Sequence, residues 1–402
     1  MHLSYALLFG ALLVLGMMGG ELARQARMPR VIGYALVGFL LGPIAQALGL
    51  DLIDEARIFV DLALGLVLFD LGRRMDLQWM RRDWSLAVTG VAESVLSFAA
   101  VFATLLAFNC PAVEAGLAAA IAMTTSPAVL MFIVHDTRSE GQVTERALNL
   151  VALNCLLASI VTTIMLGSAN YESRVDLETA FLHPVYLFLG SLAVGASMAA
   201  LARVIARAVE KSRDVHFTLI AGLVVAAVGL ATLFRLPVIL TMLAFGLFAR
   251  NDQRGYDLLN VNLAPVGRLL YIVLFVITGA SLPLGSLATA GWLAAAFVLA
   301  RALGKMVAVL VIAPIGGLRI RQAVGLGLAL LPMSSVALLL YHDIARLFPA
   351  FGNDVGAIFL AAVVIMEVLG PFAAQAGLRI AGETNPAGDR TGTFRAAGQS
   401  QG

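Results

Sequence analysis

The chain has 402 residues, of which 60% are hydrophobic and only 13% are charged. Soluble domains carry about 25% charged and about 45–50% apolar residues, so this composition excludes an ordinary soluble protein. The net charge of +2 is too balanced to indicate a nucleic-acid partner, and the two cysteines, Cys110 and Cys155, provide neither a disulfide framework nor a metal cluster.

Apolar stretches of about 20 residues follow one another along the chain, and each is long enough to cross a hydrocarbon core of about 30 Å. They predict an all-α polytopic membrane protein with about thirteen transmembrane helices in one domain, residues 1–380. The predicted spans are 4–22, 30–48, 55–73, 84–107, 112–134, 145–168, 180–207, 215–233, 236–250, 263–285, 290–313, 320–342 and 354–377. The first lacks a preceding basic segment, so we expect a retained helix rather than a cleaved signal.

Basic residues follow every odd-numbered span, whereas the alternate connections, such as 51–55 and 171–178, are acidic or almost uncharged. Because cytoplasmic loops of membrane proteins are enriched in Lys and Arg, we predict an external N-terminus and a cytoplasmic C-terminus in the inner membrane. The polar segment 381–402 is rich in Gly and Ala and is predicted to be a short disordered cytoplasmic tail.

Two spans, the fifth and the twelfth, have polar centres that contain proline. These centres are Thr124-Thr125-Ser126-Pro127 and Pro332-Met333-Ser334-Ser335. Proline removes a helical hydrogen bond, and freed carbonyls at bilayer depth are tolerated only inside protein or beside water. A single such centre is explained by a simple kink, but a matched pair favours two broken helices that form an ion site.

The positions of these centres also suggest internal symmetry. Spans one to six and eight to thirteen form two six-helix halves joined by the seventh span. Because matching helices are an odd number of spans apart, the halves would have inverted topology, as in many transporters.

Four ionisable residues lie deep within predicted spans: Glu93, Arg301, Lys305 and Glu367. A charge at mid-membrane costs about 2.5–3.5 kcal/mol, so each needs a partner or a function. The i, i+4 spacing of Arg301 and Lys305 places both cations on one helix face. The four groups can form a structural salt-bridge set, but a buried lysine is also able to exchange a proton.

The sequence contains no nucleophile–base arrangement, phosphate-binding glycine loop or metal-ligand cluster. We therefore expect neither enzymatic activity nor a cofactor or bound metal. Asp70, close to Arg73 and Arg74, and the pair His342-Asp343 lie near predicted span ends and are interpreted as interfacial groups.

Several segments resemble the monovalent cation:proton antiporter-2 family, which includes Kef-type and NapA-type sodium/proton exchangers. The similar segments are MPRVIGYALVGFLLGP at 28–43, LALGLVLFDLGRRMDL at 62–77, AIAMTTSPAVLMFIV at 120–134, ERALNLVALNCLLASI at 145–160 and RALGKMVAVLVI at 301–312. They keep the family's order, and the resemblance extends over roughly residues 5–380. The last segment is similar to the helix that carries the family's intramembrane lysine or arginine.

The resemblance implies a thirteen-helix, NhaA-like inverted-repeat fold with a dimerisation domain and a mobile core in which two discontinuous helices cross. It further implies alternating access and a homodimer. On this sequence the crossing would fall at 124–127 and 332–335.

The sequence departs from the family at Asn154-Cys155. The resemblance places here, in the sixth span, an aspartate that alternately holds a cation or a proton. Na⁺ and K⁺ prefer oxygen ligands, whereas a buried thiol is neutral and soft, so Cys155 does not replace that carboxylate.

Three explanations for Asn154-Cys155 stay open. The acid has moved, with Glu93 the first candidate and Glu367 the next; the protein carries another solute, such as an anion; or it has lost antiport and serves as a membrane scaffold, sensor or leak pathway.

We predict a secondary transporter in the lipid bilayer that exchanges Na⁺ or K⁺ for protons. The alternative is a non-transporting scaffold or sensor, or an atypical solute carrier, on the same fold. In the predicted site, Glu93 is the titrating acid and oxygen ligands come from the hydroxyl and amide groups. The full set of ion-site candidates is Glu93, Thr125, Ser126, Asn154, Cys155, Ser334 and Ser335, with Arg301, Lys305 and Glu367 as charge-balancing groups.

Overall fold

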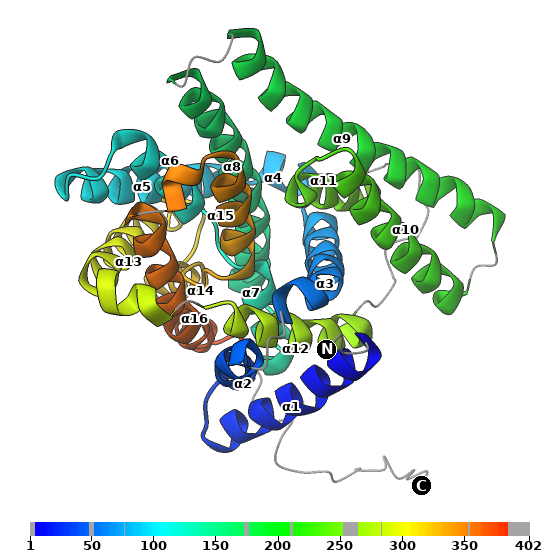
Figure 1. The fold of residues 1–402 in the computed structure, drawn as a ribbon. Coiled ribbons are helices and arrows are strands. Elements are labelled where there is room, and N and C mark those ends of the chain that lie inside the picture. Colours follow the sequence, from blue (N-terminus) through cyan, green and yellow to red (C-terminus); the bar gives the residue numbers. More distant parts are fainter. Residues whose placement is uncertain are drawn as a thin grey trace, which may run out of the picture.

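The computed structural model of the protein describes residues 5–47, 52–75, 77–172, 177–209, 212–251, 264–282, 284–352 and 354–384. Every regular element within these ranges is helical (Figure 1). The helices are α1 (Tyr5–Gln25), α2 (Arg30–Ala47), α3 (Leu52–Arg74), α4 (Leu77–Arg82), α5 (Trp84–Ala107), α6 (Ala112–Ala122), α7 (Pro127–Thr137), α8 (Gln142–Glu172), α9 (Leu177–Ala208), α10 (Arg213–Leu233), α11 (Val238–Arg250), α12 (Ala264–Ala280), α13 (Leu284–Ile312), α14 (Ile320–Ala329), α15 (Ser335–Leu347), the 3₁₀ turn η2 (Pro349–Gly352) and α16 (Asp354–Ala381).

Each predicted span coincides with one helix or, for the fifth and twelfth, with a pair of consecutive helices. The short helix α4 and the turn η2 were not predicted. Among the described residues, eight segments are long and apolar enough to cross a membrane; they comprise α1, α5, α6 with α7, α8, α9, α10, α13 and α16. The all-helical prediction is confirmed, while the count of thirteen crossings stays a prediction.

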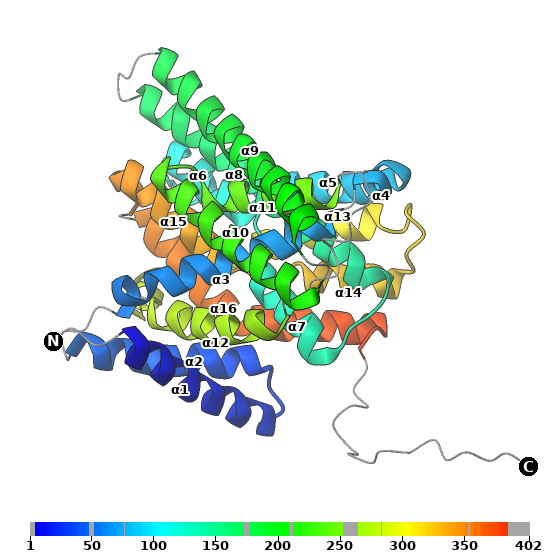
Figure 2. The same cartoon turned by 90° about the vertical axis from the view of Figure 1, so that its right-hand side faces the viewer.

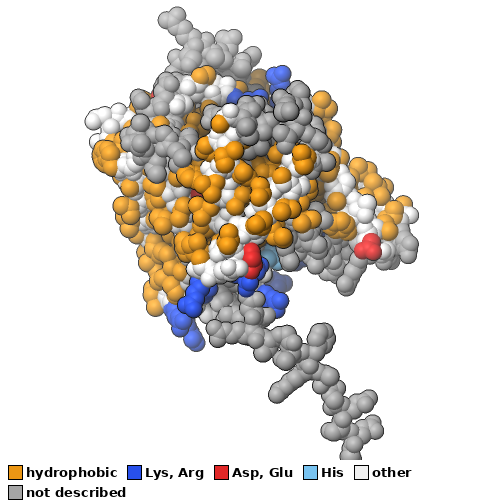
Figure 3. Space-filling model, turned by 60° about the horizontal axis from the view of Figure 1, so that its bottom comes forward, with side chains coloured by type: hydrophobic (Ala, Val, Ile, Leu, Met, Phe, Trp, Pro, Cys, Tyr) orange, Lys and Arg blue, Asp and Glu red, His pale blue; other side chains and the backbone are white. Residues whose placement is uncertain are grey.

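The outer surface of the helices is apolar. Large side chains such as Leu40, Leu233 and Ile320 are 65%, 73% and 66% exposed. Figure 3 shows hydrophobic side chains over much of one face, with basic side chains gathered at its edge. Helices satisfy their own backbone hydrogen bonds, so a surface of this kind is stable in lipid.

The helices pack into two groups that contact each other. One group, called the panel, consists of α1, α2, α3, α9, α10, α11 and α12; its closest pairs are α3 with α11, α2 with α12, and α9 with α11. The other, called the core group, consists of α5–α8 and α13–α16, with α13 packed on α5 and α16. In Figures 1 and 2, α1 and α2 lie beside α12 along one side of the molecule, and α9 runs beside α10.

Two glycines allow the core helices to approach closely enough to build a site. A Cβ atom at Gly304 of α13 would lie 2.7 Å from the backbone oxygen of Leu96 in α5. A Cβ atom at Gly370 of α16 would lie 2.9 Å from the Cα atom of Pro332. Small residues at such contacts let membrane helices pack backbone to backbone.

Candidate functional site

The first helix interruption separates α6 from α7. Helix α6 ends at Ala122, and α7 begins at Pro127, the first helical position, where a missing N–H removes no hydrogen bond. Ser126 caps α7 by accepting a hydrogen bond from the Val129 amide at 3.4 Å. The residues between Ala122 and Pro127 therefore end one half-helix and start another within a single apolar segment.

The second interruption separates α14 from α15. Residues 331–334 are not helical, and Pro332 lies among them without a backbone donor. The two predicted breaks are thus present, at the residues predicted for them.

The two interruptions contact each other directly. The Ser126 amide donates to the Pro332 carbonyl at 2.8 Å, and Thr125 Oγ1 donates to the Leu330 carbonyl at 2.8 Å. The hydroxyls of Ser126 and Ser334 lie 3.1 Å apart and share a hydrogen bond. The N-termini of α7 and α15 therefore meet at one place in the core group, where their dipoles favour negative charge.

Arg301 of α13 connects both interruptions. Its guanidinium is fully buried and donates to the carbonyls of Ala122 at 2.8 Å, Thr124 at 2.5 Å and Leu331 at 2.6 Å. Carbonyls at the end of a helix have no helical partner and carry partial negative charge. Arg301 satisfies these carbonyls inside the protein, where it is fully buried, and so holds the two interruptions together.

Lys305, one turn further along α13, forms a fully buried ion pair with Glu93 of α5. Lys305 Nζ lies 2.6 Å from Glu93 Oε2 and also donates to the Met123 carbonyl at 2.9 Å. Glu93 Oε1 makes no hydrogen bond of ordinary geometry, although the Asn154 side chain lies close to the carboxylate. The structure therefore brings Glu93 and Lys305 together beside the first interruption.

Asn154 and Cys155 of α8 face the same interruption. Asn154 Nδ2 donates to Thr125 Oγ1 at 3.3 Å, and Asn154 Oδ1 accepts from Ser94 Oγ at 3.2 Å. Cys155 Sγ donates to the Thr125 carbonyl at 3.5 Å and is fully buried. Four of the sequence-predicted residues, Glu93, Thr125, Asn154 and Cys155, are thus neighbours.

Glu367 lies elsewhere in the core group, on α16 beside the second interruption. Its side chain is 2% exposed, and Ser334 is near enough to interact with it. Neither of its oxygens makes a hydrogen bond of ordinary geometry, and the same holds for Ser335 Oγ. The structure thus places Glu367 apart from the Glu93–Lys305 pair.

Two serines of the site were missed by the sequence reasoning. Ser94 bonds to Asn154, and Ser97 Oγ donates to the Ala122 carbonyl at 3.2 Å. Ser97 lies four residues after Glu93, and this spacing was the available signal, since i and i+4 share a helix face. Ser94 follows Glu93 directly and offered no such signal.

A polar cluster fixes the N-terminal end of α8. Arg146 pairs with Asp83 at 2.5 Å and donates to the Gly316 carbonyl at 3.0 Å. The Glu383 carboxylate accepts from the amides of Val143 and Thr144, both at 2.7 Å, and so caps α8. Glu383 belongs to the predicted tail, whose residues from 385 onward lie outside the described part of the chain.

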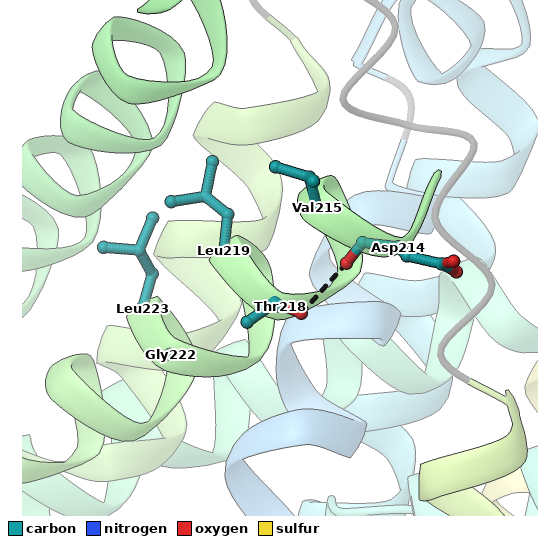
Figure 4. Close-up of a pocket in the computed structure, with 6 residues that line it drawn as sticks. All are labelled: Asp214, Val215, Thr218, Leu219, Gly222 and Leu223. Atoms are coloured by element: carbon teal, nitrogen blue, oxygen red, sulfur yellow. Dashed lines mark hydrogen bonds between the residues drawn. The ribbon is translucent and has the colours of Figure 1, made fainter. Parts of the chain in front are cut away.

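Figure 4 shows a surface pocket on α10, which belongs to the panel and not to the core group that holds the candidate residues. Residues of α10 from Asp214 to Leu223 line it, and Thr218 Oγ1 donates to the Asp214 carbonyl at 2.9 Å. None of the candidate residues borders it. Within the described residues, no three His, Cys, Asp or Glu side chains gather as a metal site.

Comparisons with known proteins agree with this architecture. A family model described as sodium/hydrogen exchanger, transmembrane, matches residues 9–375. No curated protein matches the sequence significantly. A structure of the sodium proton antiporter MjNhaP1 from Methanocaldococcus jannaschii at pH 8 has a TM-score of 0.66 and 17% identity, covering 92% of this chain and 94% of that one. An electron-microscopy structure of MjNhaP1 gives a TM-score of 0.70 and 17% identity, covering 96% and 100%. At this identity the likeness concerns the fold.

Proposed function

This chain belongs to the sodium/hydrogen exchanger transmembrane family, and we propose that it exchanges a monovalent cation, Na⁺ or K⁺, for protons. The observation that carries the proposal is the buried Glu93–Lys305 pair, 2.6 Å long, beside two interrupted helices that contact each other. A buried acid next to oxygen-rich, non-helical backbone is the chemistry that a membrane exchanger needs.

Glu93 is the cation- and proton-binding acid in this proposal. One of its oxygens is held by Lys305, while Oε1 makes no hydrogen bond of ordinary geometry and is available to a ligand. Oxygen ligands suit hard cations, and Thr125, Ser126 and Asn154 supply hydroxyl and amide oxygens nearby.

Lys305 acts as an internal competitor of the transported cation. Its ammonium neutralises Glu93 when no cation is bound, so the carboxylate is not left unpaired in the apolar core. A cation that binds Glu93 displaces the Lys305 ammonium. A proton on Glu93 weakens the binding of both the ammonium and the cation. Arg301, bonded to carbonyls of both interruptions, holds the site in shape and adds positive charge near Glu93.

Cys155 takes no part as a charged ligand in this proposal. Its thiol donates to the Thr125 carbonyl at 3.5 Å and supplies no negative charge. The acid therefore comes from α5 instead of α8, the helix that carries Asn154-Cys155.

The architecture that we propose around this site has thirteen membrane crossings in two inverted halves, each contributing one interrupted helix. The core group moves relative to the panel to give alternating access. We place the protein in the inner membrane as a homodimer, with the N-terminus outside and the C-terminal tail in the cytoplasm, where Glu383 is held against the start of α8.

Purified protein in liposomes with an internal pH dye tests the exchange. Addition of Na⁺, K⁺ or Li⁺ should move protons, and Glu93→Gln should abolish the signal. The matched control is Glu145→Gln, the same chemical change at an exposed position of α8. If none of the three cations moves protons near neutral pH, the chain is a non-transporting scaffold or sensor, or an atypical solute carrier. Full activity of Glu93→Gln would remove Glu93 from the site.

The same assay gives a pH dependence. Because proton and cation compete for Glu93, raising the pH removes the proton and should increase apparent cation affinity, approaching tenfold per pH unit where the proton dominates. A cation affinity independent of pH would show that the two ligands do not share this group.

A further inference from the structure

Glu367 is a buried carboxyl that the exchange chemistry above does not use. It lies on α16, is 2% exposed, and neither oxygen makes a hydrogen bond of ordinary geometry. Ser334 lies close enough to interact with it. Ser335 Oγ is buried beside the same interruption and also lacks a hydrogen bond. Two unsatisfied side chains at this depth indicate a ligand that the protein atoms alone do not supply.

No charge among the described side chains compensates Glu367. The ionisable side chains described on helices packed against α16 are Arg30, Tyr34, Glu114, His135, Asp136, Glu145, Arg146, Cys155, Arg301, Lys305, Arg321, Tyr341, His342, Asp343 and Arg346. The buried cations among them are bonded elsewhere: Arg301 to carbonyls, Lys305 to Glu93, and Arg146 to Asp83. Among the described side chains, the polar neighbour that interacts with Glu367 is Ser334. A carboxylate with one neighbouring hydroxyl and no cation is costly in an apolar interior, whereas the neutral acid is far less so.

A series of polar side chains connects Glu367 with the Glu93 site. Ser334 Oγ shares a hydrogen bond with Ser126 Oγ at 3.1 Å, and Ser126 follows Thr125 in the chain. Thr125 Oγ1 accepts from Asn154 Nδ2 at 3.3 Å, and Asn154 lies beside the Glu93 carboxylate. The two acids therefore lie on different helices but border one crossing.

We propose that Glu367, with Ser334 and Ser335, is a second proton-binding group of the transport core, separate from the Glu93–Lys305 pair. This inference rests on the proposed exchange function. Glu367 holds its proton as a neutral acid in the conformation seen here. When the core group opens to water, the O–H bond breaks, the proton passes to water on that side, and the carboxylate is hydrated. It is reprotonated from the opposite side, so each cycle carries one proton beyond the one exchanged at Glu93.

Infrared difference spectroscopy of the whole protein in liposomes tests whether this proton is exchangeable. A carboxylic-acid carbonyl band should appear and disappear with pH, persist in Glu93→Gln and be absent in Glu367→Gln. Ser334→Ala should shift the band without removing it, because Ser334 is the neighbour of Glu367. This shift identifies the band as that of Glu367 even if Glu367→Gln folds poorly. A spectrum in which no pH-sensitive band is lost in Glu367→Gln overturns the proposal.

Coupling stoichiometry supplies the second readout. The proton-to-cation ratio, measured as the cation gradient at which flux reverses under a fixed pH gradient and at zero membrane voltage, should fall by one in Glu367→Gln and be retained in Glu367→Asp. Glutamine mimics a permanently protonated glutamate, so an unchanged ratio and rate show that Glu367 is only structural. Absence of exchange in the wild-type protein defeats the proposed function, whereas the infrared result decides on Glu367 independently.

Discussion

The panel and the core group differ in what they bury. Within the described residues, the panel buries no charged side chain; its buried polar groups are the hydroxyls of Tyr34, Ser191, Thr241, Tyr271 and Thr278. The core group buries five charged side chains, together with many hydroxyls and the amides of Asn149 and Asn154; the charged ones are Glu93, Arg146, Arg301, Lys305 and Glu367. Charges are expensive in an apolar interior, so their restriction to one group separates an apolar packing region from a region that contains buried charge.

The two groups also satisfy their polar atoms differently. In the panel, Thr241 Oγ1 donates at 3.0 Å to the Pro237 carbonyl in its own helical turn. In the core group, Arg301 and Lys305 reach carbonyls and a carboxylate on other helices. Local bonds survive relative movement of helices, whereas bonds between helices fix one arrangement. The core polar groups are thus the ones that respond to a change of conformation.

The largest effect is expected for Arg301→Gln. This change removes the cation that bonds three carbonyls from both interruptions, and each unsatisfied buried group costs about 1–3 kcal/mol. We expect no measurable exchange and the greatest fall in thermal unfolding temperature in detergent. Arg301→Lys should recover part of the stability, because lysine restores charge but not the planar fork. If Arg301→Gln unfolds at the same temperature as the wild type, the two interruptions hold together without the Arg301 side chain.

A double-mutant cycle on Glu93 and Lys305 should give the next largest effect. Lys305→Gln leaves a buried carboxylate unpaired, which costs about 3–5 kcal/mol at a buried pair. The double variant Glu93→Gln with Lys305→Gln should be more stable than Lys305→Gln alone. Unfolding in denaturing detergent, followed by tryptophan fluorescence, measures the difference. Additive losses would indicate that the two charges are not coupled.

Cys155→Asp adds a further charge to the core group. The new carboxylate would lie beside Thr125 and close to Lys305, and should raise apparent cation affinity on the order of tenfold, equivalent to about 1.4 kcal/mol. Cys155→Ser is the neutral control and should leave affinity unchanged. Equal cation-dependent proton flux in the aspartate and serine variants would show that position 155 does not contact the ion.

The smallest effect is expected in the panel, for Thr241→Val. The Pro237 carbonyl also accepts from the Thr241 amide at 3.1 Å, so loss of the hydroxyl leaves it bonded. We expect a stability change below about 1 kcal/mol and exchange within about twofold of wild type. The matched core variant is Ser97→Ala, which removes a bond between helices, to the Ala122 carbonyl. A larger effect of Thr241→Val than of Ser97→Ala would break the distinction between the two groups.

Much of the fold follows from local sequence properties. Apolar runs located all the described helices except α4 and η2, and the prolines at positions 127 and 332 located both interruptions, because proline and hydrophobicity act on neighbouring residues. The i, i+4 spacing likewise placed Arg301 and Lys305 on one helix face. The family resemblance is confirmed by the match over residues 9–375.

The sequence alone did not determine how the charges are distributed. Four deep ionisable residues formed one candidate set, yet Arg301 bonds to carbonyls, Lys305 pairs with Glu93, and Glu367 lies apart from both. These outcomes depend on how closely α13 approaches α5 at Gly304 and α16 approaches Pro332 at Gly370. Depth in the membrane is a property of one helix, but an ion pair requires two helices to meet within hydrogen-bond distance, and only tertiary packing decides that.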